Sequence, residues 1–240
     1  MRLAIPIVIA LSFAACSSDP KVTSRKYLEN GNAYFAKGKY KLARIMYKNA
    51  LQKNQRYGDA YYQLALTDLR LNDPVSAWRN LQRAVELLPK NGPASMDSKL
   101  KLADLNLIFG QNPKSKQLVI DADNIATEFL SRDQNSFDGH RLKGDVHFVN
   151  AIYQSRGDAN QAKTTLESAI QEYRRADQIK PGQSAVQLAL ARTLAANGQF
   201  EESEKLYKTI LSKEKTSTAI YLELMRLYLS RNRLPDADTE

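Results

Sequence analysis

Few residues in this chain could carry out chemistry. His140 and His147 are the only histidines, and Asp145 lies between them. On a helix, a spacing of seven residues places both imidazoles on roughly one face, which is the start of a metal site. Zinc needs at least a third protein ligand, and none follows at helical spacing. The two histidines also stand where neighbouring segments carry tyrosine or another packing residue, so the sequence predicts a packing role for them and no bound metal.

The other polar groups lack the partners that catalysis requires. Ser17 and the scattered serines have no base placed beside them by a motif. Glu201 and Glu202 stand at the expected start of a helix, where the helix dipole and solvent account for them. Gly31 and Gly38 are too widely spaced for a phosphate-binding loop or a dinucleotide fingerprint. The sequence therefore predicts no enzyme active site and no cofactor.

The single cysteine, Cys16, follows Arg2 and an apolar stretch from Leu3 to Ala15. This is the layout of a signal peptide, and the apolar run is shorter than the roughly 20 residues that cross a bilayer as a helix. The string Phe13-Ala14-Ala15-Cys16 resembles the lipobox of bacterial lipoproteins, in which the cysteine becomes the lipidated first residue. The resemblance implies a signal peptide over residues 1–15 and lipid on Cys16. A plain secretory signal with an incidental cysteine is the alternative.

Ser17 stands directly after the cysteine, where an inner-membrane retention signal would have aspartate. The resemblance to lipoproteins therefore implies an exported protein that is anchored in the outer membrane and faces the periplasm. The multiple acyl chains of a lipoprotein would hold it durably, because one chain alone binds membranes only marginally. Residues 16–23 are then expected to form a short polar tether.

The chain is basic, with a formal net charge of +9. Removal of Arg2 with the signal peptide lowers this by one, to +8. Nucleic acid would be a natural partner for such a charge. Export separates the protein from nucleic acid, so none is predicted. Anionic envelope polymers, acidic lipid headgroups or acidic protein surfaces are expected instead, and their attraction should weaken with salt.

A repeat with a period of 34 residues organises the chain after the tether. Alanine and leucine are abundant while glycine and proline are sparse, which favours helices. Residues 24–57 and 58–91 share small and aromatic positions: Tyr27, Gly31, Ala43 and Tyr47 in the first, and Tyr61, Ala65, Ala77 and Leu81 in the second. These positions resemble the tetratricopeptide repeat. The resemblance implies an all-α protein, a right-handed α-solenoid of helix-turn-helix repeats.

Six units are expected in this array, over residues 24–57, 58–91, 96–133, 137–183, 184–217 and 218–240. The fourth carries an insertion through Gln154 to Gln161. A small residue recurs in the first helix of each of the first five units, where it should let the partner helix approach closely: Gly31, Ala65, Ala103, Gly144 and Ala191. The last unit stops as its second helix should begin, so we expect a longer array with further repeats or domains after Glu240.

In the tetratricopeptide family, the first helices line a concave surface that binds protein partners. The resemblance implies that this surface includes Arg25, Leu28, Asn32, Phe35, Tyr62, Leu66, Arg70, Arg141, Asp145, Phe148, Leu188, Arg192 and Arg226. Such a mixture of apolar, aromatic and arginine side chains suits extended or helical peptides. A solvated inner wall with no ligand is the alternative for any one of these residues.

The chain from Ser24 onward resembles tetratricopeptide lipoproteins of the bacterial envelope, including those associated with exopolysaccharide and exosortase-type export systems. The resemblance implies a scaffold that has no catalytic activity and assembles protein or polysaccharide export machinery. Two alternatives remain open. The chain could be a substrate-handling module of a larger protein whose C-terminal part is missing, or it could bind anionic glycan through basic faces that include Arg44 and Lys48.

Overall fold

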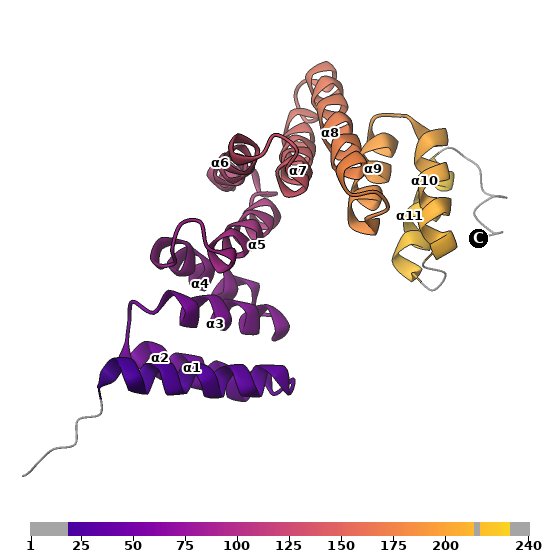
Figure 1. Cartoon of the computed structure of the whole chain (residues 1–240). Helices are drawn as coiled ribbons and strands as arrows, with labels where there is room; N and C mark the ends of the chain where they lie inside the picture. Colours follow the sequence, from indigo (N-terminus) through magenta and orange to yellow (C-terminus); the bar gives the residue numbers. More distant parts are fainter. Residues whose placement is uncertain (1–18, 214–216, 231–240) are drawn as a thin grey trace, which may run out of the picture. The chain divides into compact units, whose positions relative to one another are not determined.

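The computed structural model describes residues 19–213 and 217–230. They form eleven α-helices and one short 3-10 helix, and this part of the chain contains no β-strand (Figure 1). The prediction of an all-α fold is confirmed. Within the same ranges, no helix is both long enough and apolar enough to span a membrane. The expected signal peptide over residues 1–15, Cys16 and residues 231–240 lie outside the described residues.

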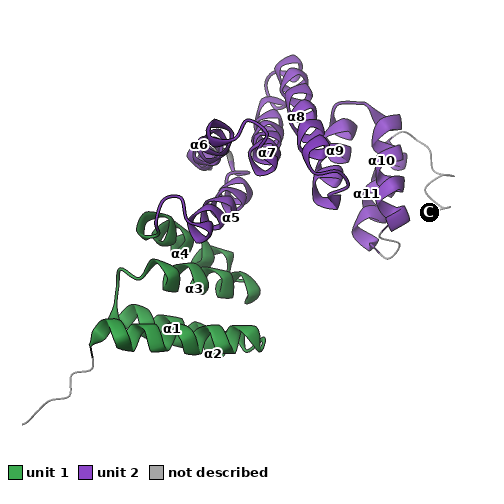
Figure 2. Cartoon of the chain, in the orientation of Figure 1, with its two compact units in different colours: residues 1–88 green, residues 89–240 purple. Residues whose placement is uncertain are grey.

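The helices follow one another as antiparallel pairs, and the chain divides into two compact units after Leu88 (Figure 2). The first unit holds α1 (Pro20–Ala36), α2 (Tyr40–Lys53), α3 (Gly58–Arg70) and α4 (Pro74–Leu87). The second unit holds α5 (Pro93–Phe109), η1 (Pro113–Ser115), α6 (Lys116–Arg132), α7 (Phe137–Gln154), α8 (Ala159–Ile179), α9 (Ser184–Ala196), α10 (Phe200–Lys213) and α11 (Thr218–Ser230).

Helix α1 begins within the segment that was expected to form the tether, residues 16–23. Asp19 is the N-cap, and its side chain accepts a hydrogen bond of 2.8 Å from the backbone N–H of Lys21. Pro20 fits the first helical position because it has no N–H to satisfy. Residues 20–23 therefore form the first turn of α1, which begins four positions after Cys16.

The α1–α2 hairpin closes on a glycine, as the sequence predicted. Gly31 lies under the ring of Tyr47, and a β-carbon added to Gly31 would be 2.6 Å from Cδ1 of that ring. Ala43, Tyr47 and Ala50 on α2 are completely buried. In the α3–α4 hairpin, the corresponding places hold Ala65 and Leu81, which are also completely buried. Small residues on the first helix thus make room for bulky ones on the second.

An ion network joins α2 to the next hairpin. The Nε of Arg44 lies 2.9 Å from Asp68 on α3, and its guanidinium also bonds Asp73, the N-cap of α4, at 2.7 Å. Asn80 donates to the other Asp68 oxygen at 2.7 Å. Burial raises the pKa of Asp68, whereas Arg44 opposes that rise. Arg44 is therefore engaged by two carboxylates, and its place in a glycan-binding face stays a prediction.

In the second unit, the fourth hairpin is longer than the others. Helix α7 has 18 residues and α8 has 21, whereas α3 and α4 have 13 and 14. The insertion expected through Gln154 to Gln161 contains the turn at 155–158 and the start of α8. Asp158 caps α8 by accepting from the N–H of Gln161 at 2.9 Å. The additional residues therefore extend both helices of the pair.

Candidate binding surface

The first helices of the second unit form two adjoining grooves that share Phe148. The acidic groove has a volume of about 280 Å³ and is lined by Asp104, Leu107, Ile108, Gln111, Asp145, Phe148 and Val149. The basic groove has a volume of about 330 Å³ and is lined by Phe148, Arg192, Ala195, Phe200, Tyr207, Glu223, Arg226, Leu227 and Ser230. Most of the lining comes from the alternate helices α5, α7, α9 and α11, with Phe200 and Tyr207 added from α10, and the aromatic side chain of Phe148 lies between the two hollows.

The acidic groove is set by a network around Arg141. Its guanidinium bonds Asp104 at 2.8 Å and Asp145 at 2.9 Å, and the hydroxyl of Tyr173 donates to Asp145 at 2.7 Å. Burial raises the pKa of Asp145, although Arg141 and Tyr173 oppose the rise. Two carboxylates face one guanidinium, so this groove has a negative charge beside the apolar side chains.

In the basic groove, positive side chains outnumber negative ones. Arg192 pairs with Glu223 at 2.9 Å, and Arg226 lies 3.7 Å from the same carboxylate. Arg226 is 71% exposed, so most of its guanidinium faces solvent. Two arginines share one glutamate beside the apolar side chains of Phe148 and Leu227. The groove can therefore take an apolar side chain together with a carboxylate.

Six of the predicted binding residues belong to this second unit. Phe148, Arg192 and Arg226 come together in the basic groove, whereas Asp145 lines the acidic one. Leu188 is half-buried and packs against the core of α9, α10 and α11. Arg141 is held by its two carboxylates beneath the surface. The binding role of all six stays a prediction, and Arg226 has the most exposed side chain of the three arginines.

The other seven predicted residues lie in the first unit. Leu28 and Phe35 are half-buried against the core formed with Ala43, Tyr47 and Leu64. Tyr62 and Leu66 are half-buried on α3, whereas Arg25, Asn32 and Arg70 are exposed. Their binding role also stays a prediction.

Two of the predicted binding residues, Asn32 and Asp145, each accept a hydrogen bond from a different buried tyrosine. The hydroxyl of Tyr47 donates to Asn32 at 2.8 Å, just as that of Tyr173 donates to Asp145. Burial raises the pKa of Tyr47 to about 12, so its hydroxyl remains a donor at neutral pH. Gly144 lies under the Tyr173 ring as Gly31 lies under Tyr47. A glycine in the first helix therefore lets the ring reach the next residue of that helix, a pairing that sequence reasoning missed.

Sequence reasoning also missed several groove residues. Asp104 stands at the ninth place of the third unit, which corresponds to Asn32 and Asp145 in their units, so the repeat register could have identified it. Glu223 lies outside the family's usual binding places, and only its contact with Arg192 reveals it.

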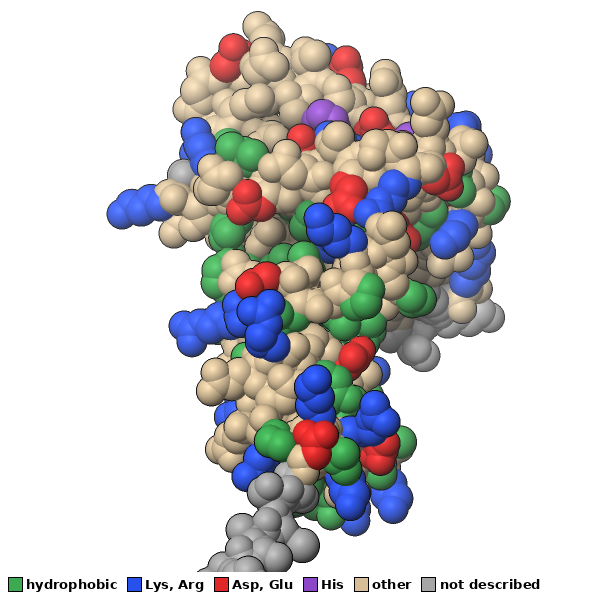
Figure 3. Space-filling model, turned by 60° about the vertical axis from the view of Figure 1, so that its left-hand side comes forward, with side chains coloured by type: hydrophobic (Ala, Val, Ile, Leu, Met, Phe, Trp, Pro, Cys, Tyr) green, Lys and Arg blue, Asp and Glu red, His purple; other side chains and the backbone are tan. Residues whose placement is uncertain are grey.

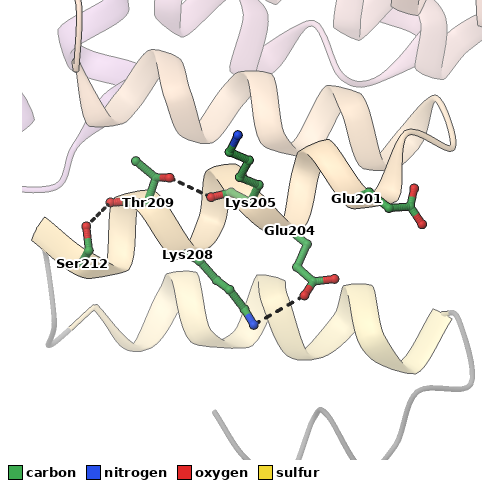
Figure 4. A pocket seen from close by; sticks show the side chains of 6 residues that line it. All are labelled: Glu201, Glu204, Lys205, Lys208, Thr209 and Ser212. Carbon is green, nitrogen blue, oxygen red and sulfur yellow. Dashed lines mark hydrogen bonds and ion pairs between the residues drawn. The ribbon is translucent and has the colours of Figure 1, made fainter.

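A third hollow, of about 680 Å³, lies along one side of α10 (Figure 4). Lys208 lies 3.4 Å from Glu204, while the hydroxyls of Thr209 and Ser212 donate to backbone carbonyls of the same helix. Glu201 points away from these groups in the close-up. The polar groups of this hollow are satisfied largely within α10, so they form no converging site.

The two histidines and the glutamate pair considered in the sequence analysis contact other residues and do not converge on one site. The Nδ1 of His140 lies 2.6 Å from Glu172, and its Nε2 lies 3.0 Å from the carbonyl oxygen of Gln134. His147 is half-buried, and burial lowers its pKa. Glu202 pairs with Arg174 at 2.8 Å. Among residues 19–213 and 217–230, no group of three His, Cys, Asp or Glu side chains is placed to hold a metal ion.

Comparison with known proteins agrees with this architecture. A tetratricopeptide repeat family model matches residues 154–216. No curated protein sequence matches the chain.

Solved structures of similar fold cover most of the chain. The MamA protein has a TM-score of 0.57 at 20% identity, over 82% of this chain and 94% of its own. TTC0263, a thermophilic TPR protein in Thermus thermophilus, has a TM-score of 0.54 at 17% identity, over 86% and 99%. A tetratricopeptide repeat protein from Parabacteroides merdae has a TM-score of 0.66 at 16% identity, over 91% and 77%. Residues 154–216 are therefore tetratricopeptide repeat sequence, and the chain has the α-solenoid fold of tetratricopeptide proteins.

Proposed function

We propose that this protein is a scaffold of the bacterial envelope, without catalytic activity, which holds protein partners on the groove face of α5, α7, α9 and α11. The observation that carries this proposal is the pair of grooves around Phe148. The fold supports it, because tetratricopeptide proteins commonly bind other proteins. Lipid on Cys16 would anchor the scaffold, and assembly of an export machinery is the role that we assign to it.

The chemistry of the grooves matches that of protein interfaces. Aromatic and arginine side chains contribute much of the binding energy at interfaces, especially where apolar neighbours exclude water. Phe148 supplies a half-buried aromatic side chain, and Arg226 supplies an exposed cation beside Leu227. An apolar anchor with a nearby carboxylate, carried by a helical or extended segment, would satisfy both groups.

The binding face is tested by combining Phe148→Ala with Arg226→Glu. Because both side chains line the groove, we expect partner proteins from detergent-solubilised envelopes to be captured at least tenfold less. Phe148 also packs against the core of α8 and α9, so circular dichroism at the assay temperature checks that the variant is folded. The matched control is Ile120→Ala with Lys163→Glu, which alters an exposed apolar residue and a cation on α6 and α8. Equal capture by the groove variant and its control would refute the proposed face.

The anchor is tested by growing cells with an alkyne-tagged fatty acid. Cys16→Ser removes the thiol that would carry lipid, so we expect the protein to lose the label completely. The unaltered chain, expressed at the same level, should carry it. Labelling of the serine variant would contradict lipidation at Cys16.

A further inference from the structure

The net charge of the chain is concentrated in its first unit. Residues 19–88 contain 13 Lys and Arg against 6 Asp and Glu, a net of +7, whereas residues 89–240 contain 21 against 20, a net of +1. Figure 3 shows Lys and Arg side chains with hydrophobic ones between them at the lower end of the view, where the first unit lies. The basic character of the protein is thus a property of the α1–α4 unit.

Few of these cations are neutralised nearby. Within residues 19–88, the ion pairs formed are those of Arg44 and Arg83. Lys37, Lys39 and Lys41 are exposed around the turn between α1 and α2. The unit therefore has exposed cations in excess of its carboxylates, which would attract an anionic partner.

An apolar hollow lies beside the same turn. It has a volume of about 410 Å³ and is lined by Gly38, Lys39, Tyr40, Lys41, Leu42 and Leu71. The ring of Tyr40 is set by an edge-on contact with Phe35, with their centroids 5.2 Å apart. We call this hollow, together with Lys37, the basic turn patch. It joins the turns of two successive hairpins of the first unit.

Exposed apolar side chains continue along the face of α2 that carries Lys41, Leu42, Ile45 and Lys48, which we call the outer face of α2. Leu42 is 42% exposed and Ile45 is 50% exposed. Lys41, Ile45 and Lys48 follow at helical spacing, so cations and an apolar side chain share one face. A soluble polyanion would bind the lysines but would gain nothing from the exposed aliphatic side chains. The interface of an anionic bilayer would bind both kinds of side chain, because its phosphates attract lysines and its acyl boundary accepts apolar groups.

From these observations we infer that the first unit docks on anionic lipid bilayers through the basic turn patch and the outer face of α2. The occupant is the lipid surface itself, and the docking requires no lipid on Cys16. This inference takes only the envelope location from the proposed function. If Cys16 is lipidated, Pro20 would stay within about 15 Å of the bilayer, and the local concentration of the first unit at the membrane would be high.

The test uses the chain beginning at Ser17, so that neither the signal peptide nor Cys16 contributes to binding. We expect it to co-sediment with vesicles of phosphatidylcholine containing about 30% phosphatidylglycerol and to remain free of vesicles of phosphatidylcholine alone. Raising the salt concentration from about 50 to about 300 mM should weaken binding at least tenfold. No binding to the anionic vesicles would overturn the inference while leaving lipidation of Cys16 and the groove face intact.

Charge reversal locates the surface. The triple variant Lys37→Glu, Lys39→Glu and Lys41→Glu should bind anionic vesicles at least tenfold more weakly. Its matched control makes the same change in total charge at three exposed lysines of the second unit: Lys114→Glu, Lys163→Glu and Lys205→Glu. The control should bind within twofold of the unaltered chain. Helical circular dichroism checks that both variants are folded, and equal losses in the two would overturn the assignment to the first unit.

Apolar substitution distinguishes a bilayer from a soluble polyanion. Leu42→Ser with Ile45→Ser leaves the charge unchanged and removes two exposed aliphatic groups. We expect at least a threefold loss of vesicle binding, with unchanged binding to heparin. Unchanged vesicle binding in this variant would show attraction to charge alone and would overturn the bilayer as occupant.

Discussion

Gly31→Ala is expected to lower the free energy of unfolding by about 1–3 kcal/mol. The new β-carbon would overlap the ring of Tyr47, with Cδ1 at 2.6 Å, and this ring is completely buried and cannot swing into solvent. Alanine favours a helix over glycine by up to about 1 kcal/mol, so the overlap has to exceed that gain. Urea denaturation of the whole chain measures the balance.

Two further variants make this prediction specific. Gly157→Ala is the control, because no atom lies within 4 Å of the added β-carbon, and its effect should stay within about 0.5 kcal/mol. Gly31→Ala combined with Tyr47→Leu reproduces the Ala65 and Leu81 pair of the next hairpin and should recover part of the loss. Equal stability of the Gly31 and Gly157 variants would show that the hairpin does not close on this glycine.

Arg44→Ala is expected to cost about 3–5 kcal/mol at neutral pH. Asp68 is 1% exposed, and loss of the guanidinium would leave its carboxylate buried with Asn80 as the remaining donor. Arg79→Ala, an exposed residue of the same unit, is the matched control and should change stability by less than about 0.5 kcal/mol. Urea denaturation of both variants separates a buried ion pair from a simple loss of surface charge.

The same variant should show a defined pH dependence. Burial already raises the pKa of Asp68, and removing Arg44 takes away the largest influence that lowers it. A carboxyl whose pKa is raised by folding loses stability as pH rises from the unfolded pKa through the folded one. The cost of Arg44→Ala should therefore be smallest near pH 4 and grow toward pH 7. A cost that is independent of pH, or that Asp68→Asn fails to reduce, would contradict this account.

The positions of the helices could be predicted from the sequence, because a period of 34 residues and two small positions per hairpin determine which faces meet. Gly31 and Ala43 were identified in this way, and both are buried where expected. Glycine and asparagine end the first helices of two hairpins, where Gly38 and Asn72 have positive φ angles of 68° and 55°.

The partners of individual polar residues could not be predicted. Arg44 reaches Asp68 and Asp73, which lie 24 and 29 residues further along the chain, and its spacing alone made it look like a surface cation. Asn32 and Asp145 were assigned to the binding surface, but each also accepts a bond from a buried tyrosine. Such pairings depend on side-chain conformers across two helices, whereas the repeat determines backbone positions only.

The lining of the two grooves could likewise be predicted only in part. Phe148 was predicted from its repeat position, but the two hollows on either side of it are also lined by residues of other helices that were not predicted, among them Asp104 and Glu223. The unequal distribution of charge between the two units was present in the sequence. It became informative once the structure divided the chain after Leu88.

The central claim, that proteins bind at the groove face, is tested most directly by site-specific photo-crosslinking in living cells. A photoreactive phenylalanine analogue replaces Phe148 in one strain and Thr164, an exposed residue of α8, in another. We predict that irradiation links a discrete protein partner to the chain at position 148 and leaves the chain at position 164 unlinked. The absence of any crosslink at position 148, or identical products at both positions, would contradict the account.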